Sequence, residues 1–384
     1  MKSFKGVLEN FLPISDMTTW KTPLTSPQEL IPAPWSAKKI NEWYNNISLP
    51  VGCNYIPHNA INQLEMWQAE TFDPIIIDKE LGWAAELGFN TARVFLHHLC
   101  WEQDSKGFLQ RIHEFLCIAD KHGIKIMFVL FDGVWDPFPK AGTQPAPKAF
   151  VHNSGWVQCP GFDILNDVGR HQEMFGYVHG VVDHFKNDKR VLIWDVFNEP
   201  DNMNLASYKD DNYSFHKAAL SLQLLKKAVK WIRAIDPIQP LTMAPWQYEW
   251  DVPSKLTELD NFMFTQADVI SFHCYENKEG MEKRIQQLKR YKRPMLCTEY
   301  MARPFSSTFK DILPLFKKNK VGGYNWGFVA GKSQTHCAWD SWQTPKEPEN
   351  WFHDIFTSEG IPYCEKEVAF LKIFNNQPAE VCTA

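Results

Sequence analysis

The stretch VLIWDVFNEP at residues 191–200 is a short apolar run with a polar end, and a proline closes it. Similar apolar, β-rich runs recur along the chain, at residues 51–55, 91–96, 124–131, 241–245, 269–275, 295–299 and 321–327. Apolar runs of this length are typical of strands that are buried on both faces of a parallel sheet. The sequence therefore predicts eight strands.

Amphipathic helical patterns alternate with these runs. They occupy residues 74–87, 109–122, 171–186, 215–235, 255–264, 281–291, 308–318 and 365–374. Eight strands alternating with helices predict an α/β fold, the (β/α)8 TIM barrel. An open doubly wound sheet is the rival arrangement, but no glycine-rich phosphate loop follows any early strand, so its dinucleotide-binding version has no support.

Two connections are too long for plain barrel loops. Residues 132–167 follow the third strand and residues 331–363 follow the eighth, both at carboxyl ends of strands, where barrels build their binding sites. We expect both loops to shape a substrate cleft. We also expect residues 1–384 to form a single barrel domain, with residues 1–50, rich in Pro, Ser, Thr and Trp, as an N-terminal extension packed on the barrel.

The composition favours an uncharged partner. The net charge is only -5, and the Lys and Arg residues are dispersed, so neither nucleic acid nor a membrane is an expected partner. Nine Cys without a framework favour a reducing compartment, and residues 1–10 lack the apolar core of a signal peptide. A cytoplasmic location is expected, and a secreted or periplasmic one stays open if a leader precedes this sequence. The oligomeric state is left open.

The end of the fourth strand carries a recognisable motif. Asn198-Glu199-Pro200 would place a carboxylate at the mouth of the barrel, with Pro200 ending the strand behind it. This motif resembles clan A glycoside hydrolases, and most closely glycoside hydrolase family 5, the cellulase-like barrels. The resemblance implies that Glu199 is the general acid/base and that Asn198 holds the 2-hydroxyl of the substrate.

A second carboxylate ends the seventh strand in the same way. Glu299 closes the run RPMLCTE at residues 293–299, where the clan places its nucleophile. Strands four and seven lie on opposite sides of a barrel, so Glu199 and Glu299 should face each other across the mouth. The resemblance implies a retaining hydrolase that cleaves β-glycosidic bonds of glucan, xylan or mannan type by double displacement, without a metal or cofactor. The sugar, and exo or endo action, stay open.

Other strands carry side chains that match the family. Arg93 on the second strand resembles the arginine that keeps the nucleophile ionised. His273 and Tyr275 share one face of the sixth strand and match the family's His-x-Tyr, in which the Tyr donates to the nucleophile and the His lines the sugar subsite. Trp326 on the eighth strand matches the tryptophan that floors the subsite where cleavage occurs.

One position departs from the family. Where a histidine usually ends the third strand, this chain has Phe131-Asp132-Gly133, and His97-His98 follow the second strand instead. Either Asp132 and His98 rebuild the same hydrogen bonds at the substrate, or the protein belongs to another branch of the clan. Several aromatic residues near strand ends could line the cleft or belong to the core, namely Tyr55, Trp135, Trp246, Trp339, Trp342 and Trp351.

The sequence leaves two other functions open. A metal-dependent barrel hydrolase could use His97, His98, Asp132 and His273 as ligands, although the two adjacent histidines should point to opposite faces of a strand. A barrel that binds carbohydrate without hydrolysing it would be expected to lack one of the two carboxylates, and both are present.

Overall fold

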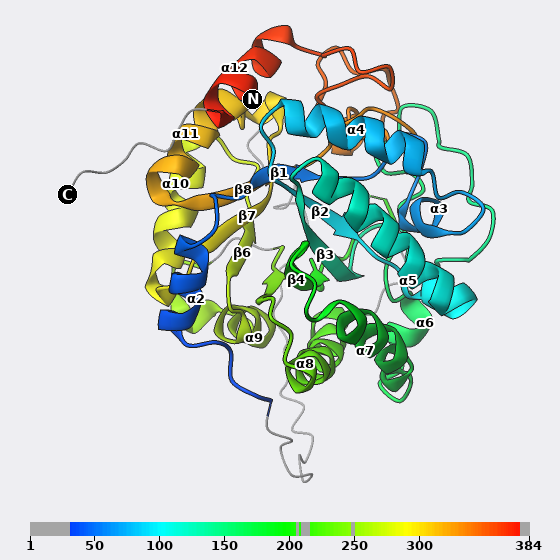
Figure 1. The fold of residues 1–384 in the computed structure, drawn as a ribbon, viewed down its shortest axis with the longest axis vertical. Coiled ribbons are helices and arrows are strands. Elements are labelled where there is room, and N and C mark those ends of the chain that lie inside the picture. Colours follow the sequence, from blue (N-terminus) through cyan, green and yellow to red (C-terminus); the bar gives the residue numbers. More distant parts are fainter. Residues whose placement is uncertain (1–30, 205–206, 209–215, 247–249, 377–384) are drawn as a thin grey trace. The chain divides into compact units, whose positions relative to one another are not determined.

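Eight parallel strands form the centre of the structure (Figure 1). The computed structural model describes residues 31–204, 207–208, 216–246 and 250–376. All eight predicted strands are confirmed: β1 (Val51–Asn54), β2 (Thr91–Phe95), β3 (Lys125–Asp132), β4 (Val191–Asn198), β5 (Leu241–Ala244), β6 (Ile270–His273), β7 (Met295–Tyr300) and β8 (Val321–Asn325). Their order in the sheet is β5-β4-β3-β2-β1-β8-β7-β6.

Side-chain and backbone hydrogen bonds close the barrel between β5 and β6. The amide N of Asp268 donates to the carbonyl oxygen of Leu241 at 2.9 Å. Thr242 Oγ1 donates to the carbonyl oxygen of Val269 at 2.7 Å and forms a second hydrogen bond of 2.7 Å with Ser271 Oγ, whose hydroxyl can be the donor. The arrangement is the predicted (β/α)8 TIM barrel, since sequential strands are neighbours around a nearly closed parallel sheet.

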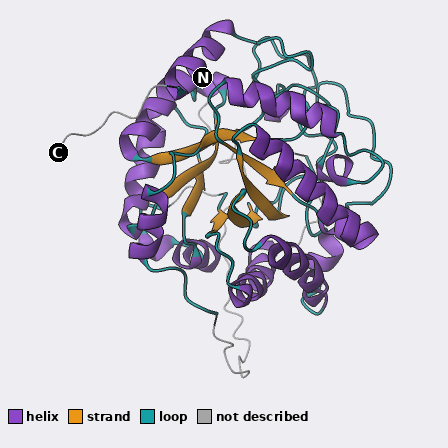
Figure 2. Ribbon diagram, in the orientation of Figure 1, coloured by secondary structure: helices purple, strands orange, loops and turns teal. Residues whose placement is uncertain are grey.

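Helices surround this sheet, as Figure 2 shows. The helices are α2 (Ala37–Asn45), α3 (Gln63–Trp67), α4 (Pro74–Glu86), α5 (His98–Lys121), α6 (Phe162–Leu165), α7 (Met174–Phe185), α8 (Lys217–Ile235), α9 (Glu258–Gln266), α10 (Lys278–Leu288), α11 (Phe309–Asn319) and α12 (Glu365–Asn375). Over the described ranges, no helix has the length and apolar character needed to cross a membrane.

Local signals explain where the helices begin. Asp73 accepts hydrogen bonds from the amides of Ile75 and Ile76, and Pro74 occupies the first position of α4. Thr257 and Asp260 form a capping box at the start of α9. Helix α5 begins at His98 and not at the predicted residue 109. Residues 98–108 are also helical, and the helix has a kink at Asp104.

Residues 32–50 belong to the same compact unit as the barrel. The amide N of Trp35 donates to Asp268 Oδ1 at 2.6 Å, just before β6. Ile40 and Tyr44 of α2 are buried in an apolar cluster with Leu296 and Tyr324. Most of the predicted extension, residues 1–30, lies outside the described residues, so its packing on the barrel stays a prediction.

Candidate active site

Glu199 directly follows β4, where the backbone turns sharply. Its φ of 44° lies in the left-handed region, which non-glycine residues rarely adopt. The amide N of Glu199 donates to the carbonyl oxygen of Ala244 at 2.8 Å. Gly133, after β3, approaches so closely that a Cβ there would clash with the carbonyl group of Glu199. Strained backbone of this kind is often found at functional sites.

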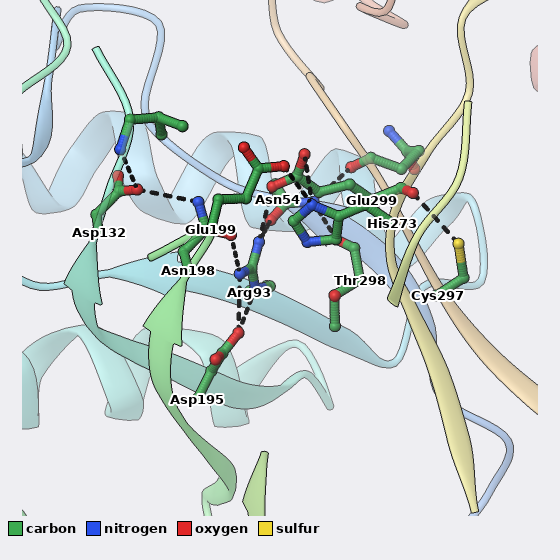
Figure 3. Close-up of polar contacts among 12 residues, drawn as sticks. Asn54, Arg93, Asp132, Asp195, Asn198, Glu199, His273, Cys297, Thr298 and Glu299 are labelled. Carbon is green, nitrogen blue, oxygen red and sulfur yellow. Dashed lines mark hydrogen bonds and ion pairs between the residues drawn. The ribbon is translucent and has the colours of Figure 1, made fainter. Parts of the chain in front are cut away.

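Arg93, on β2, is fully buried and connects four polar side chains (Figure 3). Its Nη1 donates to Asn54 Oδ1 at 2.9 Å and to Glu299 Oε1 at 3.1 Å. Its Nε and Nη2 donate to Asp195 Oδ2 at 3.0 and 2.8 Å, and Nη2 also donates to Asn198 Oδ1 at 2.7 Å. One guanidinium therefore orients groups from β1, β4 and β7.

Glu299, on β7, is held at both carboxylate oxygens. Arg93 binds Oε1, and Tyr275 Oη donates to Oε2 at 2.7 Å. Only 6% of Glu299 is exposed. Hydrogen bonds from a cation and a phenol favour the charged form of a carboxylate. The contact between Tyr275 and Glu299 is the one that the family resemblance implied.

His273 lies between the two glutamates. Its Nδ1 is 2.6 Å from Glu199 Oε1 and 3.5 Å from Glu299 Oε2. Asn202 Nδ2 donates to the other oxygen of Glu199 at 2.7 Å. Oxygen atoms of the two carboxylates and the His273 nitrogen all lie within 4.8 Å of one another. The structure therefore brings Glu199 and Glu299 together, as the sequence predicted.

Burial favours the neutral form of both Glu199 and His273, so it shifts their pKa values in opposite directions. It raises the pKa of Glu199 to about 7, although Asn202 and Arg93 act in the other direction. It lowers the pKa of His273 to about 4, so the ring is neutral near pH 7. Burial also raises the pKa of Glu299, against the effects of His273 and Arg93. Glu199 lacks a direct hydrogen bond from Arg93, so it is the carboxyl group better suited to keep a proton.

Asp132 ends β3 and is part of the same network. Asn198 Nδ2 donates to Asp132 Oδ1 at 2.9 Å, and Trp156 Nε1 and Gln63 Nε2 donate to Oδ2 at 2.7 and 3.1 Å. Burial raises the pKa of Asp132 to about 7. Asp132 thus reaches Asn198 from the strand end where the family usually has a histidine.

The structure does not bring His98 to the site. Only 2% of this residue is exposed, and its Nδ1 lies 3.4 Å from Cys159 Sγ. The rings of His97 and His98 stack with centroids 4.8 Å apart, so they do not point to opposite faces as predicted. The reason is local: β2 ends at Phe95 and His98 begins α5, so strand alternation does not apply to these residues.

Trp326 directly follows β8 and belongs to an aromatic cluster. Its ring lies 6.0 Å from that of Phe95 and 5.9 Å from that of Trp156, both edge to face. Tyr275 is part of the same cluster. Trp326 is 6% exposed and therefore retains some accessible surface next to the carboxylate network. Tyr55, by contrast, is a core residue that donates to Glu80 at 2.9 Å.

Sequence reasoning missed four residues that support the network. Asn54 and Asp195 bind Arg93, and Asn202 binds Glu199. Lys217, at the start of α8, is buried and donates from Nζ to the carbonyl oxygens of Gly133 and Asn202. Asp195 could have been recognised from the sequence, because a charged residue within an otherwise apolar strand needs a buried partner. No comparable pattern in the sequence indicates Asn202 or Lys217.

The metal-ligand set considered from the sequence is not assembled. Within the described ranges, the groups of three potential ligands are His97, His98 and Cys159, and separately Glu199, His273 and Glu299. Both nitrogens of His97 already have partners, since Nδ1 accepts from the amide of Leu99 and Nε2 lies 2.9 Å from the carbonyl oxygen of Gln158. The structure therefore does not bring together His97, His98, Asp132 and His273, the ligand set of the alternative metal-dependent hydrolase.

The family described as cellulase, glycosyl hydrolase family 5, matches residues 58–345, which is most of the chain. The chain belongs to this family and is a glycoside hydrolase, as the sequence motifs predicted. No curated protein matches the sequence significantly.

Solved structures share the barrel. An exo-β-1,4-mannosidase, Op5Man5 from Opitutaceae bacterium strain TAV5, has 18% identity and a TM-score of 0.58, covering 85% of this chain and 59% of that one. GH5_18 from Streptomyces cattleya, in complex with GlcNAc, has 14% identity and a TM-score of 0.56 over 86% and 82% of the two chains. An endo-1,4-β-D-mannanase from Thermotoga petrophila RKU-1 has 14% identity and a TM-score of 0.52 over 85% and 100%. At these identities the likeness shows the fold alone.

Removing the charge of Arg93 is expected to destabilise the protein. In Arg93→Met, Asp195 and Glu299 would keep buried carboxylates without their cation. Removing one partner of a buried ion pair typically lowers the free energy of unfolding by about 3–5 kcal/mol. We expect the free energy of unfolding in urea to fall by about that amount. A loss below about 1 kcal/mol would show that the buried carboxylates do not depend on Arg93.

Proposed function

We propose that the protein is a retaining glycoside hydrolase in which Glu299 is the nucleophile and Glu199 the general acid/base. The short separation of the two carboxylates carries this proposal, since oxygens from both lie within 4.8 Å of each other. Retaining enzymes keep their carboxyl groups about 5–5.5 Å apart, whereas inverting enzymes need about 6.5–9.5 Å to admit a water molecule.

In the first step, Glu199 gives its proton to the glycosidic oxygen while Glu299 attacks the anomeric carbon. The bond between that carbon and the leaving oxygen breaks, the leaving sugar departs as an alcohol, and a glycosyl ester forms on Glu299. The raised pKa of Glu199, about 7, supports its role as the proton donor. Arg93 and Tyr275 support an ionised Glu299 through their hydrogen bonds.

In the second step, Glu199 takes a proton from a water molecule, whose oxygen attacks the anomeric carbon and releases Glu299. Two inversions at the same carbon return the original anomeric configuration. Asn198 would hold the substrate's 2-hydroxyl, and His273, Trp326 and Asp132 would line or support the sugar subsite. Asp132 would act mainly by orienting Asn198, from which it accepts a hydrogen bond.

The substrate is proposed to be a β-linked glucan, xylan or mannan, or an oligosaccharide derived from one. Among structures with the same fold, an exo-mannosidase, an endo-mannanase and a protein in complex with Manβ1-4GlcNAc make β-mannosides the first candidates to test. The experiment is hydrolysis of a panel of aryl β-glycosides, with the mannoside, glucoside, xyloside and galactoside compared. Activity on none of them, and on no β-linked oligosaccharide, would refute the proposal.

Simple controls distinguish two other functions from the proposed one. A carbohydrate-binding barrel without activity would bind oligosaccharides equally well in Glu299→Gln and would show no turnover in either form. A metal-dependent hydrolase would lose activity on treatment with a chelator, whereas the proposed mechanism predicts no loss. The presence of both carboxylates in one network supports hydrolysis over binding alone.

The pH dependence of kcat/KM is expected to follow Glu199. This group must be protonated to act as the acid, and its pKa is about 7. Activity should therefore fall about tenfold per pH unit above that value, because the protonated fraction falls at that rate. In Glu199→Gln, measured on the same oligosaccharide as the unmodified protein, the residual kcat/KM should show no such alkaline fall. An unchanged alkaline limb in the variant would assign it to another group.

A further inference from the structure

Hydrogen bonds connect the loops that follow β3 and β8 over one side of the barrel mouth. Figure 1 shows them in green and orange on the side of α3 and α4. Gln334 lies at the centre of the contact: its Oε1 accepts from the amide of Phe150 at 2.7 Å. Its Nε2 donates to the carbonyl oxygens of Lys148 and Val151 at 2.6 and 3.1 Å.

A second set of contacts surrounds His152 in the loop after β3. Its amide N donates to Ser341 Oγ at 3.0 Å, and its Nδ1 lies 2.9 Å from the carbonyl oxygen of Cys337. Trp342 Nε1 donates to the carbonyl oxygen of His152 at 2.8 Å. The ring of Trp342 also stacks on Trp135, with centroids 5.8 Å apart and planes within 11°.

Neighbouring loops extend this contact into a continuous structure, which we call the wall. After β1, Asn62 Nδ2 donates to the carbonyl oxygen of Gly155 at 2.7 Å, and Lys332 Nζ binds Glu65 at 2.6 Å. After β2, His97 Nε2 contacts the carbonyl oxygen of Gln158 at 2.9 Å. The wall therefore joins the loops of four adjacent strands, β3, β2, β1 and β8.

The wall meets the proposed sugar subsite directly. Trp156, from the loop after β3, contacts the ring of Trp326 and binds Asp132. The space between these rings and Phe95 is a cavity of about 10 Å³, enough for about one water molecule and far too small for a sugar. Glu199 and Glu299 are only 7% and 6% exposed, so little of either residue is open to solvent.

We propose that the wall ends the substrate site one sugar beyond the cleaved bond, so that the enzyme removes single sugars from the nonreducing ends of β-linked chains. This inference rests on the proposed function, which places the sugar attacked by Glu299 on Trp326. In this proposal the leaving group departs past Glu199, which gives it the proton, and the wall, which adjoins Trp326, blocks the nonreducing side of the attacked sugar. A chain passing through the site would have to displace the wall, with its buried residues Asn153, Ser333 and Cys337.

The test follows the first products from a β-1,4-linked pentasaccharide that carries a label at its reducing end, using the sugar that the aryl glycoside panel identifies. The expected result is unlabelled monosaccharide together with labelled tetrasaccharide, from the earliest time points. Labelled di- and trisaccharides at early times would overturn the proposal, and so would labelled monosaccharide. No turnover of any glycoside would instead refute the proposed function, so the two failures are distinguishable.

A wall variant tests the cause of this pattern. In Gln334→Ala/Trp342→Ala, the ratio of internal to terminal cleavage should rise about tenfold, at the lower end of the discrimination that packing in a pocket provides. The matched control is Gln287→Ala/Trp231→Ala. Gln287 accepts a hydrogen bond from Arg284 on α10, and Trp231 of α8 packs on Phe175 of α7, so neither residue belongs to the wall. A folded wall variant with the product pattern of the control would show that the wall does not set the mode of action.

Discussion

Replacing Glu299 with Gln is expected to lower kcat by at least about 10³-fold, which corresponds to about 4 kcal/mol of transition-state stabilisation. An amide has nearly the same shape as the carboxylate but does not attack the anomeric carbon. The hydrogen bonds from Arg93 and Tyr275 identify this side chain as the one held for attack. The measurement is steady-state hydrolysis of the best aryl glycoside in the panel.

A matched control separates chemistry from folding. Glu276→Gln removes a carboxylate that follows β6 but binds Arg284 of α10 at 3.0 Å, outside the network. We expect its activity to stay within about twofold of the starting protein, in the range of ordinary surface changes. Addition of azide to Glu299→Ala should yield the α-glycosyl azide, because only one displacement then occurs. A Glu299→Gln protein that retained about a tenth of the activity would contradict the assignment.

Replacing Glu199 with Gln is expected to give a loss that depends on the leaving group. For oligosaccharides, whose leaving alcohol needs a proton, we expect kcat/KM to fall about 10²–10⁴-fold, the usual contribution of a general acid. For a dinitrophenyl glycoside the first step needs no acid, so the glycosyl-enzyme should form rapidly and then accumulate. A burst of dinitrophenol followed by slow turnover is the expected observation.

The intermediate itself provides the control for this second experiment. In Glu199→Ala, azide should speed up the second step and yield the β-glycosyl azide, since two displacements have then occurred. Mass spectrometry of the accumulated species should place the sugar on the peptide that contains Glu299. Equal losses on oligosaccharides and on the dinitrophenyl substrate would show that Glu199 is not the acid.

The barrel could be predicted because each strand is a separate apolar run whose signal is local. The runs that became β4 and β7 also end in carboxylates, so Glu199 and Glu299 could be placed at the mouth from strand position alone. Helix boundaries were less accurate. The start of α5 was missed because polar residues around Asp104 break the helical pattern there.

Contacts between distant loops left no such signal. His98 was expected at the substrate as a replacement for the missing third-strand histidine, but β2 ends at Phe95 and His98 begins α5. Asn202 follows β4 in a loop and Lys217 begins α8, and only the folded backbone shows that their side chains bind Glu199 and the carbonyl oxygen of Gly133. The sequence predicted that the long loops shape the cleft, but it did not show how they contact each other. Their hydrogen bonds join residues more than 180 positions apart.

The most direct test of the account is the anomeric configuration of the first product, followed by proton NMR on the substrate that the panel identifies. The close approach of the carboxylates of Glu199 and Glu299 predicts that the β-anomer appears first and then mutarotates to the equilibrium mixture. Initial release of the α-anomer would mean a single displacement by water, and would contradict the assignment of Glu299 as the nucleophile.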